Sequence, residues 1–327
     1  MTRQTRRTLA ALGVALIATT FAFPTTAQSY PERPMRVSVG FPAGTGPDLL
    51  ARVVGQRLSE FLNQPVVIEN KPGAGGQIAT QLVAKSAADG YNLLMAEAGS
   101  VSIAPAAFEK LPYIPARELV GVAELAWADF VLVVPVISPY KTLAEIVSAN
   151  KGKSKPLNFA TFGAGSPGHF GAMEFGTQAD VKVEPIHFRS TGDAVTAIIA
   201  GDVDSAWVST AVASAQIKGG KMRALATTAN TRSQLLPTVP TTAEAGMPNL
   251  NFSSWLAILA PAGTPEAVLD TLSRGFVRTV QVPEVRQKLI EAGFRVTGAG
   301  RSETDRMLKA EALRWGAIVK TSGFKGD

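Results

Sequence analysis

The sequence RVSVGFPAGTGPDLL, residues 36–50, joins a short apolar segment to a glycine-rich turn and then to the beginning of a helix. Apolar residues after the turn recur at positions 49, 50, 53, 54, 58, 61 and 62, a period near 3.6 that predicts a helix with one buried face. Gly44 and Gly46 permit a tight turn, and Pro47 suits the first helical position because no N–H is lost there. The stretch therefore predicts a strand-to-helix junction.

A helix start of this kind leaves backbone N–H groups without intrahelical acceptors and carries partial positive charge. It is a common binding site for a carboxylate, phosphate or sulfate. The turn is not followed by the Gly-Lys-Ser/Thr of a phosphate loop, and it lacks the Gly-x-Gly-x-x-Gly of a dinucleotide site. The turn is consistent with binding of a small anion, and an ordinary connection between strand and helix is the alternative.

The first 27 residues have the pattern of an export signal. Arginines at positions 3, 6 and 7 precede an apolar run over residues 9–23, and small residues follow up to Ala27. We therefore expect a signal peptide over residues 1–27, cleaved after Ala27, and a mature exported protein that begins at Gln28. The apolar run is short for a membrane span, although an uncleaved anchor is the alternative.

The composition excludes several classes of function. The chain has no cysteine, so disulfides, thiol catalysis and thiolate metal sites are excluded. The two histidines, His169 and His187, have no acidic cluster nearby in sequence, so we expect no metal and no cofactor. The net charge of +6 includes the three signal-peptide arginines, which leaves +3, and Lys and Arg are scattered. Nucleic acid is therefore not an expected partner.

The strand, turn and helix pattern recurs along the chain. Residues 65–70 read as a strand, residues 71–76 as a glycine-rich turn and residues 77–87 as a helix, before another strand at 92–96. Ser100 and Ser102 are expected to cap a short helix that follows. This alternation predicts a parallel sheet with helices on both faces.

The pattern also predicts two lobes. The most apolar strand, residues 130–135, is expected to cross into a second lobe, and residues 252–261 are expected to return to the first. Lobe 1 is then residues 28–127 and 253–327, and lobe 2 is residues 128–252. Further strands are expected at 157–161, 183–188, 205–208 and 223–227, and helices at 141–150, 194–200, 265–280, 283–292 and 302–320, the last with a capping box from Ser302 to Asp305.

The predicted second lobe contains a strand-to-helix junction similar to the first. After the strand at 157–161 the sequence FGAGSPGH, residues 162–169, offers Ser166 as an N-cap and Pro167 as a first helical residue. Two helix starts suited to an anion, one in each predicted lobe, are more informative than either alone.

Six ordered motifs together resemble a known family: YPERP at residues 30–34, GFPAG at 40–44, ENKPGAGG at 69–76, DGY at 89–91, PTVPTTAEAG at 237–246 and APAGTP at 260–265. They closely resemble the periplasmic solute receptors of tripartite tricarboxylate transporters, the Bug proteins. The resemblance covers essentially the whole mature chain.

The resemblance implies a two-lobed α/β fold of the Venus flytrap type, type II-like, with each lobe a mostly parallel sheet flanked by helices. It implies a ligand, usually a carboxylate, held in the cleft between the lobes by main-chain amides and waters from two loops. Carried over to this sequence, those positions are Phe41, Ala43, Gly44, Thr45, Gly46 and Asp48 in the first loop, and Gly163, Gly165, Ser166 and His169 in the second.

The chain departs from the family pattern at three places. The usual Gly-Gly-Ala-Thr-Asp is here GTGPD at residues 44–48, and the frequent Pro-Tyr-Lys-Gly is here HFRS at residues 187–190. Val208 stands where many relatives have an acid or an amide. These differences bear on the identity of the ligand rather than on the fold.

Several side chains are candidates for ligand contact. Arg189, in a predicted turn, can bind a second carboxylate through two parallel hydrogen bonds, or it is an ordinary surface arginine. Phe41, Phe162 and Trp207, with Phe188, are predicted apolar walls, and the alternative for each is the core. Ser100 and Ser209, which follow predicted strands, complete the predicted binding set.

Asp48, His169 and the serines are the residues that could indicate catalysis. Asp48 lies in the first helical turn, where an acid commonly serves the helix dipole and loop amides rather than catalysis. His169 is expected to donate a hydrogen bond to the ligand. The serines lack the nucleophile elbow and the partners that hydrolysis needs.

The sequence therefore predicts a non-catalytic periplasmic solute-binding protein, expected to be a monomer, that delivers a small organic carboxylate to membrane transporter subunits. Two opposed anion sites with aromatic lining favour a dicarboxylate, with an aromatic one such as terephthalate as a candidate. A receptor that serves a sensor kinase and an exported α/β hydrolase of small esters or amides are the alternatives.

Overall fold

The computed structural model describes residues 30–188 and 191–326. Residues 33–188 and 191–326 form one compact unit. The predicted signal peptide, its cleavage site and Arg189 therefore lie outside the described residues.

Three parallel strands begin what we call the first strand group, in the order β2 (Val66–Asn70), β1 (Met35–Val39) and β3 (Asn92–Glu97). β9 (Ser253–Pro261) pairs with β3 in antiparallel sense, and residues 119–129 of β4 (Leu119–Pro135) pair with β9. β10 (Phe294–Ala299) pairs with the same part of β4. The carboxyl ends of β1, β2 and β3 therefore lie along one edge of the sheet.

The second strand group is built on the other end of β4. Its members are β8 (Met222–Thr227), residues 130–135 of β4, β7 (Ser205–Ser209), β5 (Leu157–Thr161) and β6 (Val183–His187). β4 is antiparallel to β7 and β8, whereas β5 is parallel to β6 and β7. The prediction of parallel strands is confirmed for β1 to β3 and for β5 to β7, and it is wrong for the strands beside β4.

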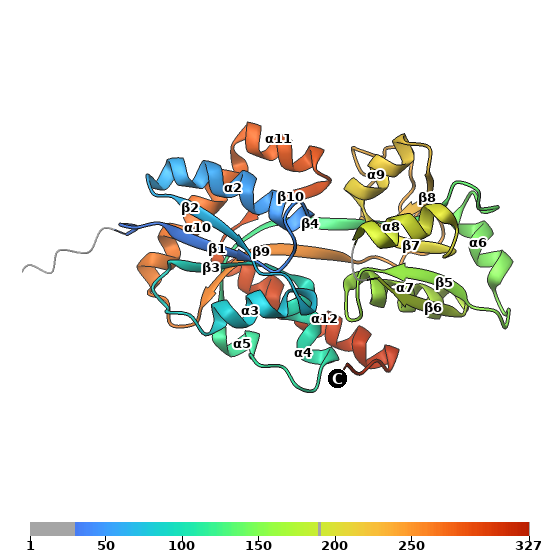
Figure 1. Cartoon of the computed structure of the whole chain (residues 1–327), viewed down its shortest axis with the longest axis horizontal. Coiled ribbons are helices and arrows are strands. Elements are labelled where there is room, and N and C mark those ends of the chain that lie inside the picture. Colours follow the sequence, from blue (N-terminus) through green and yellow to red (C-terminus); the bar gives the residue numbers. More distant parts are fainter. Residues whose placement is uncertain (1–29, 189–190, 327) are drawn as a thin grey trace, which may run out of the picture. The chain divides into compact units, whose positions relative to one another are not determined.

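β4 joins the two groups, and it runs beside β9 over the crossing (Figure 1). The sequence predicted only its second half, residues 130–135, because polar residues interrupt the first half. Those residues have specific partners: Asp129 accepts hydrogen bonds from Ser253 and Arg295, and Glu124 accepts one from the indole of Trp127. Tertiary partners thus allow two acidic residues, Glu124 and Asp129, within an otherwise apolar buried strand.

The α-helices are α2 (Gly46–Leu62), α3 (Gln77–Ala84), α4 (Ala104–Ala107), α5 (Pro115–Glu118), α6 (Leu143–Asn150), α7 (Pro167–Ala179), α8 (Thr191–Ala200), α9 (Thr210–Lys218), α10 (Glu266–Gln281), α11 (Pro283–Glu291) and α12 (Arg301–Ser322). In addition, η1 (Ala74–Gly76) is a short 3₁₀-helix and η2 (Gly99–Ile103) is a single π-helical turn. Neither α9 nor β10 was predicted.

Local capping follows the sequence in some places and not in others. Ser166 caps α7 and Thr142 caps α6 through their side chains, as expected for hydroxyl residues at that position. The capping box at Ser302 is wrong, because α12 begins at Arg301 and its N-cap is Gly300. The caps predicted for Ser100 and Ser102 are also wrong, since both residues lie inside η2.

Helices pack on both faces of the first strand group. α2, α10 and α11 contact one another on one face, and α12 contacts β4, η2 and α4 on the other (Figure 1). One core cluster contains Trp255 and Trp315 from this part of the chain together with Phe159 and Trp207 from the second group. The core is thus continuous across the two groups, and the lobe boundaries at 127/128 and 252/253 stay a prediction.

None of the helices within the described ranges has both the length and the apolar character that a bilayer crossing requires.

The close approach of two glycines allows a direct test of the fold. A Cβ on Gly40 would lie 2.6 Å from the Cα of Gly76, so Gly40→Ala forces backbone atoms apart. We expect a loss of roughly 1–3 kcal/mol in the free energy of unfolding, measured by urea denaturation. Gly316→Ala is the matched control: it lies within α12 with nothing within 4 Å of a new Cβ, so it should stabilise the protein by up to about 1 kcal/mol. A Gly40→Ala protein as stable as the wild type would contradict the packing described.

Candidate functional site

The loop after β1 is organised by the side chain of Asp48, in the first turn of α2. Its carboxylate accepts hydrogen bonds from Gly44 N (2.9 Å), Arg52 Nε (3.0 Å) and Asn70 Nδ2 (2.8 Å). Asn70 also donates to the carbonyl of Phe41 (3.0 Å), which ties β2 to the same loop. Asp48 is therefore occupied with its own loop, as the sequence suggested for an acid at this position.

The charge of Asp48 is stabilised where it lies. The residue is buried, which acts to raise its pKa, but the hydrogen bonds from Arg52, Gly44 and Asn70 outweigh burial and hold the pKa below its usual value. The carboxylate is thus ionised at neutral pH, and it fixes the glycine-rich turn that precedes α2.

The start of α2 leaves donors unpaired. Thr45 is the N-cap but its side chain makes no capping hydrogen bond. Within the described part of the chain, the backbone N–H groups of Gly46 and Asp48 have no protein acceptor. They are available to an anion or to water, as expected at a helix start.

The loops after β1, β2 and β3 meet at the edge of the sheet. A Cβ on Gly76 would lie 3.5 Å from the Ser100 side chain and 3.6 Å from the ring of Phe41. Ser100 Oγ accepts a hydrogen bond from Thr80 Oγ1 (2.8 Å) and is buried. Two predicted site residues, Phe41 and Ser100, are therefore neighbours across Gly76, although Ser100 Oγ already has a partner.

Glu97, at the carboxyl end of β3, belongs to the same group of loops. Its Oε1 accepts from Gly99 N (3.0 Å) and its Oε2 from Ser254 Oγ (2.9 Å) on β9. Burial raises the pKa of Glu97 to about 7, and the two hydrogen bonds only partly oppose this. Glu97 can therefore exchange a proton near neutral pH.

The start of α7 in the second strand group resembles that of α2. Ser166 Oγ accepts from His169 N (3.3 Å), and Pro167 is the first helical residue. Gly168 is buried, and its N–H has no acceptor among residues 30–188 and 191–326. A buried backbone donor without a protein partner indicates a place for a ligand or a water.

His169 lies beneath this loop. Its Nδ1 accepts a hydrogen bond from Gly165 N (3.2 Å), so in the neutral ring the proton is on Nε2. Burial, with His187 beside it at 4.8 Å between ring centroids, lowers the pKa of His169 to about 4. The imidazole is therefore neutral at pH 7. His187 Nδ1 lies 2.6 Å from Thr161 Oγ1.

Aromatic contacts connect the α7 loop to the end of the chain. The ring of Phe324 packs edge-on against His169 at 5.0 Å and Phe170 at 5.7 Å. Phe324 also contacts Phe108, whose ring would lie 3.1 Å from a Cβ on Gly165. The residues after α12 therefore help to position the second loop.

The remaining predicted site residues have different surroundings. Trp207 is fully buried, and its ring packs edge-on against Phe252, so it belongs to the core and not to a loop surface. Ser209 caps α9 by accepting from Val212 N (3.5 Å). Phe162 is half-buried beside a second core cluster.

Arg189 lies outside the described residues. Ala43 and Gly44 are exposed, whereas Thr45 and Gly163 are half-buried.

Sequence reasoning missed Glu97, Asn70 and Phe324. Glu97 follows a buried strand, which was a usable signal, because residues at the carboxyl ends of parallel strands gather at one edge. Asn70 and Phe324 gave no such signal, since their partners, Asp48 and His169, are distant in sequence.

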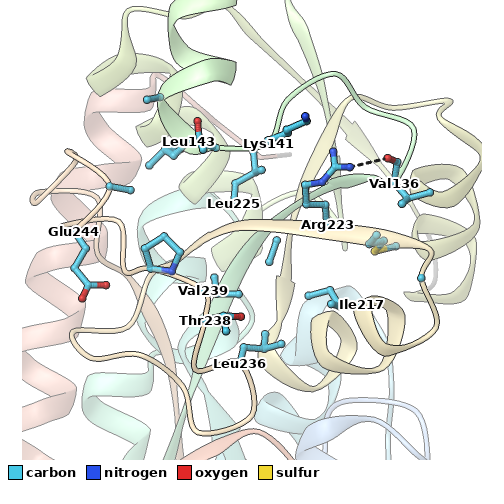
Figure 2. A pocket seen from close by; sticks show the side chains of 17 residues that line it. Val136, Lys141, Leu143, Ile217, Arg223, Leu225, Leu236, Thr238, Val239 and Glu244 are labelled. Carbon is cyan, nitrogen blue, oxygen red and sulfur yellow. Dashed lines mark hydrogen bonds between the residues drawn. The ribbon is translucent and has the colours of Figure 1, made fainter.

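Two cavities lie away from these loops. One of about 630 Å³ is lined by the end of α9, by β8 and by residues 141–144 and 236–245; Figure 2 shows apolar side chains such as Leu143, Ile217 and Leu236 around it, and the guanidinium of Arg223 bonded to the carbonyl of Val136. A second cavity, of about 360 Å³, lies beside Trp127, Arg295 and Arg314. No group of three His, Asp or Glu side chains in the described ranges is arranged to hold a metal ion.

The two strand groups that β4 joins form an α/β fold that matches the structures of periplasmic binding proteins. The family model described as the tripartite tricarboxylate transporter family receptor matches residues 50–324. The chain belongs to this family.

Relatives and solved structures agree with this membership. The chain is 31% identical over 320 residues to protein BugT of Bordetella pertussis, which covers 98% of each chain. It is 28% identical to Rpa4515 of R. palustris, solved with adipate, with a TM-score of 0.84 over 90% of this chain and 99% of the other. It is 31% identical to MatC of Rhodopseudomonas palustris, solved with bound malate, with a TM-score of 0.80 over 89% and 100%. Membership places the chain among periplasmic solute receptors.

The raised pKa of Glu97 predicts how stability depends on pH. Glu97 ionises near its ordinary pKa of 4.5 in the unfolded chain and near 7 in the folded protein, so the folded state binds more protons in this window and stability falls as pH rises through it. Glu97→Gln keeps an oxygen acceptor but cannot ionise. We expect it to unfold with a free energy higher than the wild type by on the order of 3 kcal/mol at pH 8 and equal to it at pH 4.5, measured by urea denaturation. A difference that does not change with pH would contradict the assignment.

Proposed function

We propose that this protein is a periplasmic receptor that binds a small organic carboxylate between its two predicted lobes and delivers it to a tripartite tricarboxylate-type membrane transporter. The observation that carries the proposal is the pair of helix starts with unpaired N–H groups: Gly46 and Asp48 on α2, and Gly168 on α7. Each suits one end of an anion. A ligand that meets both starts holds the two strand groups together when the protein closes.

The relatives support a dicarboxylate. Adipate and malate, named with the two solved relatives, each carry two carboxylates on an aliphatic spacer. In this chain the ring of Phe41 and the half-buried Phe162 follow β1 and β5 and supply apolar surface beside the helix starts. We propose a dicarboxylate with an apolar spacer, and terephthalate is a candidate because its ring suits contact with aromatic side chains.

Neutral groups around the second helix start favour binding over catalysis. The imidazole of His169 is neutral, its Nδ1 accepts from the backbone of Gly165, and Ser166 Oγ donates to the carbonyl of Gly163 (2.8 Å). This arrangement holds the loop, and it does not align a serine with a general base. A receptor that reports to a sensor kinase would need the same binding site, so the gene beside this one distinguishes the two roles.

The test is calorimetric titration of the mature protein with malate, adipate, terephthalate and the monocarboxylate benzoate. We expect at least one dicarboxylate to bind, and benzoate to bind more weakly because it reaches only one helix start. Asp48→Asn should weaken binding by roughly tenfold or more, because an amide cannot accept from Gly44, Arg52 and Asn70 as the carboxylate does. Asp202→Asn, at an exposed acid, is the control and should bind as the wild type does. Failure of every carboxylate to bind would contradict the proposal.

A further inference from the structure

We propose that Glu97 determines specificity by donating a hydrogen bond, in its protonated form, to a carboxylate oxygen of the ligand. Binding then favours protonation of Glu97 and takes up a proton from solution. This inference rests on the proposed function and assigns a role to a residue that lies outside the predicted binding set. It makes the chain a receptor in which an acid, rather than a cation, recognises one end of an anion.

The position of Glu97 places it in the ligand-facing group of loops. A Cβ on Gly99 would lie 2.4 Å from Glu97 Oε1 and 3.7 Å from the carbonyl oxygen of Gly75, so the acid and the turn before α3 lie on the same side of the Gly99 backbone, close to each other. Gly76 in that turn contacts Phe41 and Ser100. Glu97 retains some accessible surface, although it is deeply set. The acid is therefore within the edge where β1, β2 and β3 end.

The described surroundings of Glu97, which do not include Arg189, contribute neutral hydrogen-bonding groups. Among the described residues, no Arg, Lys or His forms an ion pair with it. β9 contributes the hydroxyl of Ser254, η2 contributes the N–H of Gly99, and η1 contributes glycine backbone. The titratable group facing it is Tyr113, whose pKa is raised, first by burial and further by Glu97 itself, so the phenol is neutral. Asp129 and Glu124, on β4, have partners of their own.

An anionic ligand favours the protonated form of such an acid over the ionised form. An ionised Glu97 would repel a carboxylate in a site of low polarity, whereas a protonated one donates a short, strong hydrogen bond to it. With its pKa near 7, Glu97 takes up the proton at little cost near neutral pH. A ligand bearing an ammonium group would have the opposite effect, because it would stabilise the ionised acid and release a proton.

The geometry also indicates which oxygen carries the proton. Oε1 accepts from Gly99 N, whose hydrogen cannot turn away, so Oε1 stays an acceptor. Oε2 accepts from the hydroxyl of Ser254, which can rotate its hydrogen away, so Oε2 is the oxygen that can carry a proton. On binding, one O–H bond forms at Oε2 with a proton from the buffer acid, and that O–H donates to the ligand carboxylate.

The experiment is calorimetric titration of malate, adipate and terephthalate at pH 6 and pH 8, each in two buffers of different ionisation enthalpy. We expect the wild type to take up nearly one proton at pH 8 and little at pH 6, where Glu97 is already mostly protonated, and to bind with an affinity roughly tenfold lower at pH 8 than at pH 6, as a group with a pKa of about 7 dictates. Glu97→Gln retains a donor in its amide, so it should bind at pH 8 as tightly as the wild type at pH 6, with no proton uptake. Glu97→Ala removes the donor and should bind more weakly at both pH values.

The control is Glu109→Gln, at an exposed glutamate, which should keep the wild-type pH dependence. Binding with no proton exchange, or with release of a proton, would overturn the role of Glu97 and leave the proposed function standing. Failure of all three dicarboxylates to bind to the wild type and to Glu97→Gln, at either pH, would overturn the proposed function and this inference with it.

Discussion

The contact between the backbones of Gly40 and Gly76 is the constraint on which the first half of the site depends. Because neither residue has a side chain, the loops after β1 and β2 approach closely enough for Phe41 and Ser100 to become neighbours. The carboxylate of Asp48 then fixes the path of the chain into α2 by binding Gly44, Arg52 and Asn70. One steric condition and one buried charge together create a helix start with free donors.

Both helix starts present backbone N–H groups and the positive end of a helix dipole, but different side chains hold the loop before each helix. At α2 a buried carboxylate fixes the preceding loop, whereas at α7 the loop is held by the hydroxyl of Ser166, the neutral ring of His169 and the ring of Phe324 from the end of the chain. At both starts, backbone N–H groups have no acceptor among residues 30–188 and 191–326. An anion that meets both gains from two dipoles, and Glu97 adds a site whose charge depends on pH.

The sequence predicted the features that depend on neighbouring residues. The strand at 157–161, the Ser166 cap and the helix after GTGPD follow from short patterns, and the structure confirms them. It failed where distant partners decide: Asp129 in the first part of β4 is paired with Arg295 and Ser253, and Trp207, expected at a loop, is buried against Phe252. The role of Asp48 was foreseen in kind, but its partner Asn70 was not, because that pairing depends on the fold.

The central claim is that N–H groups at the starts of α2 and α7 bind the two ends of one ligand. The most direct measurement is amide-resolved hydrogen exchange by NMR, with and without a saturating dicarboxylate. The account predicts that the amides of Gly46, Asp48 and Gly168, which have no acceptor in the part of the chain that the structure describes, exchange more slowly when the ligand is bound. Exchange at these amides that is unchanged by a ligand shown to bind would contradict it.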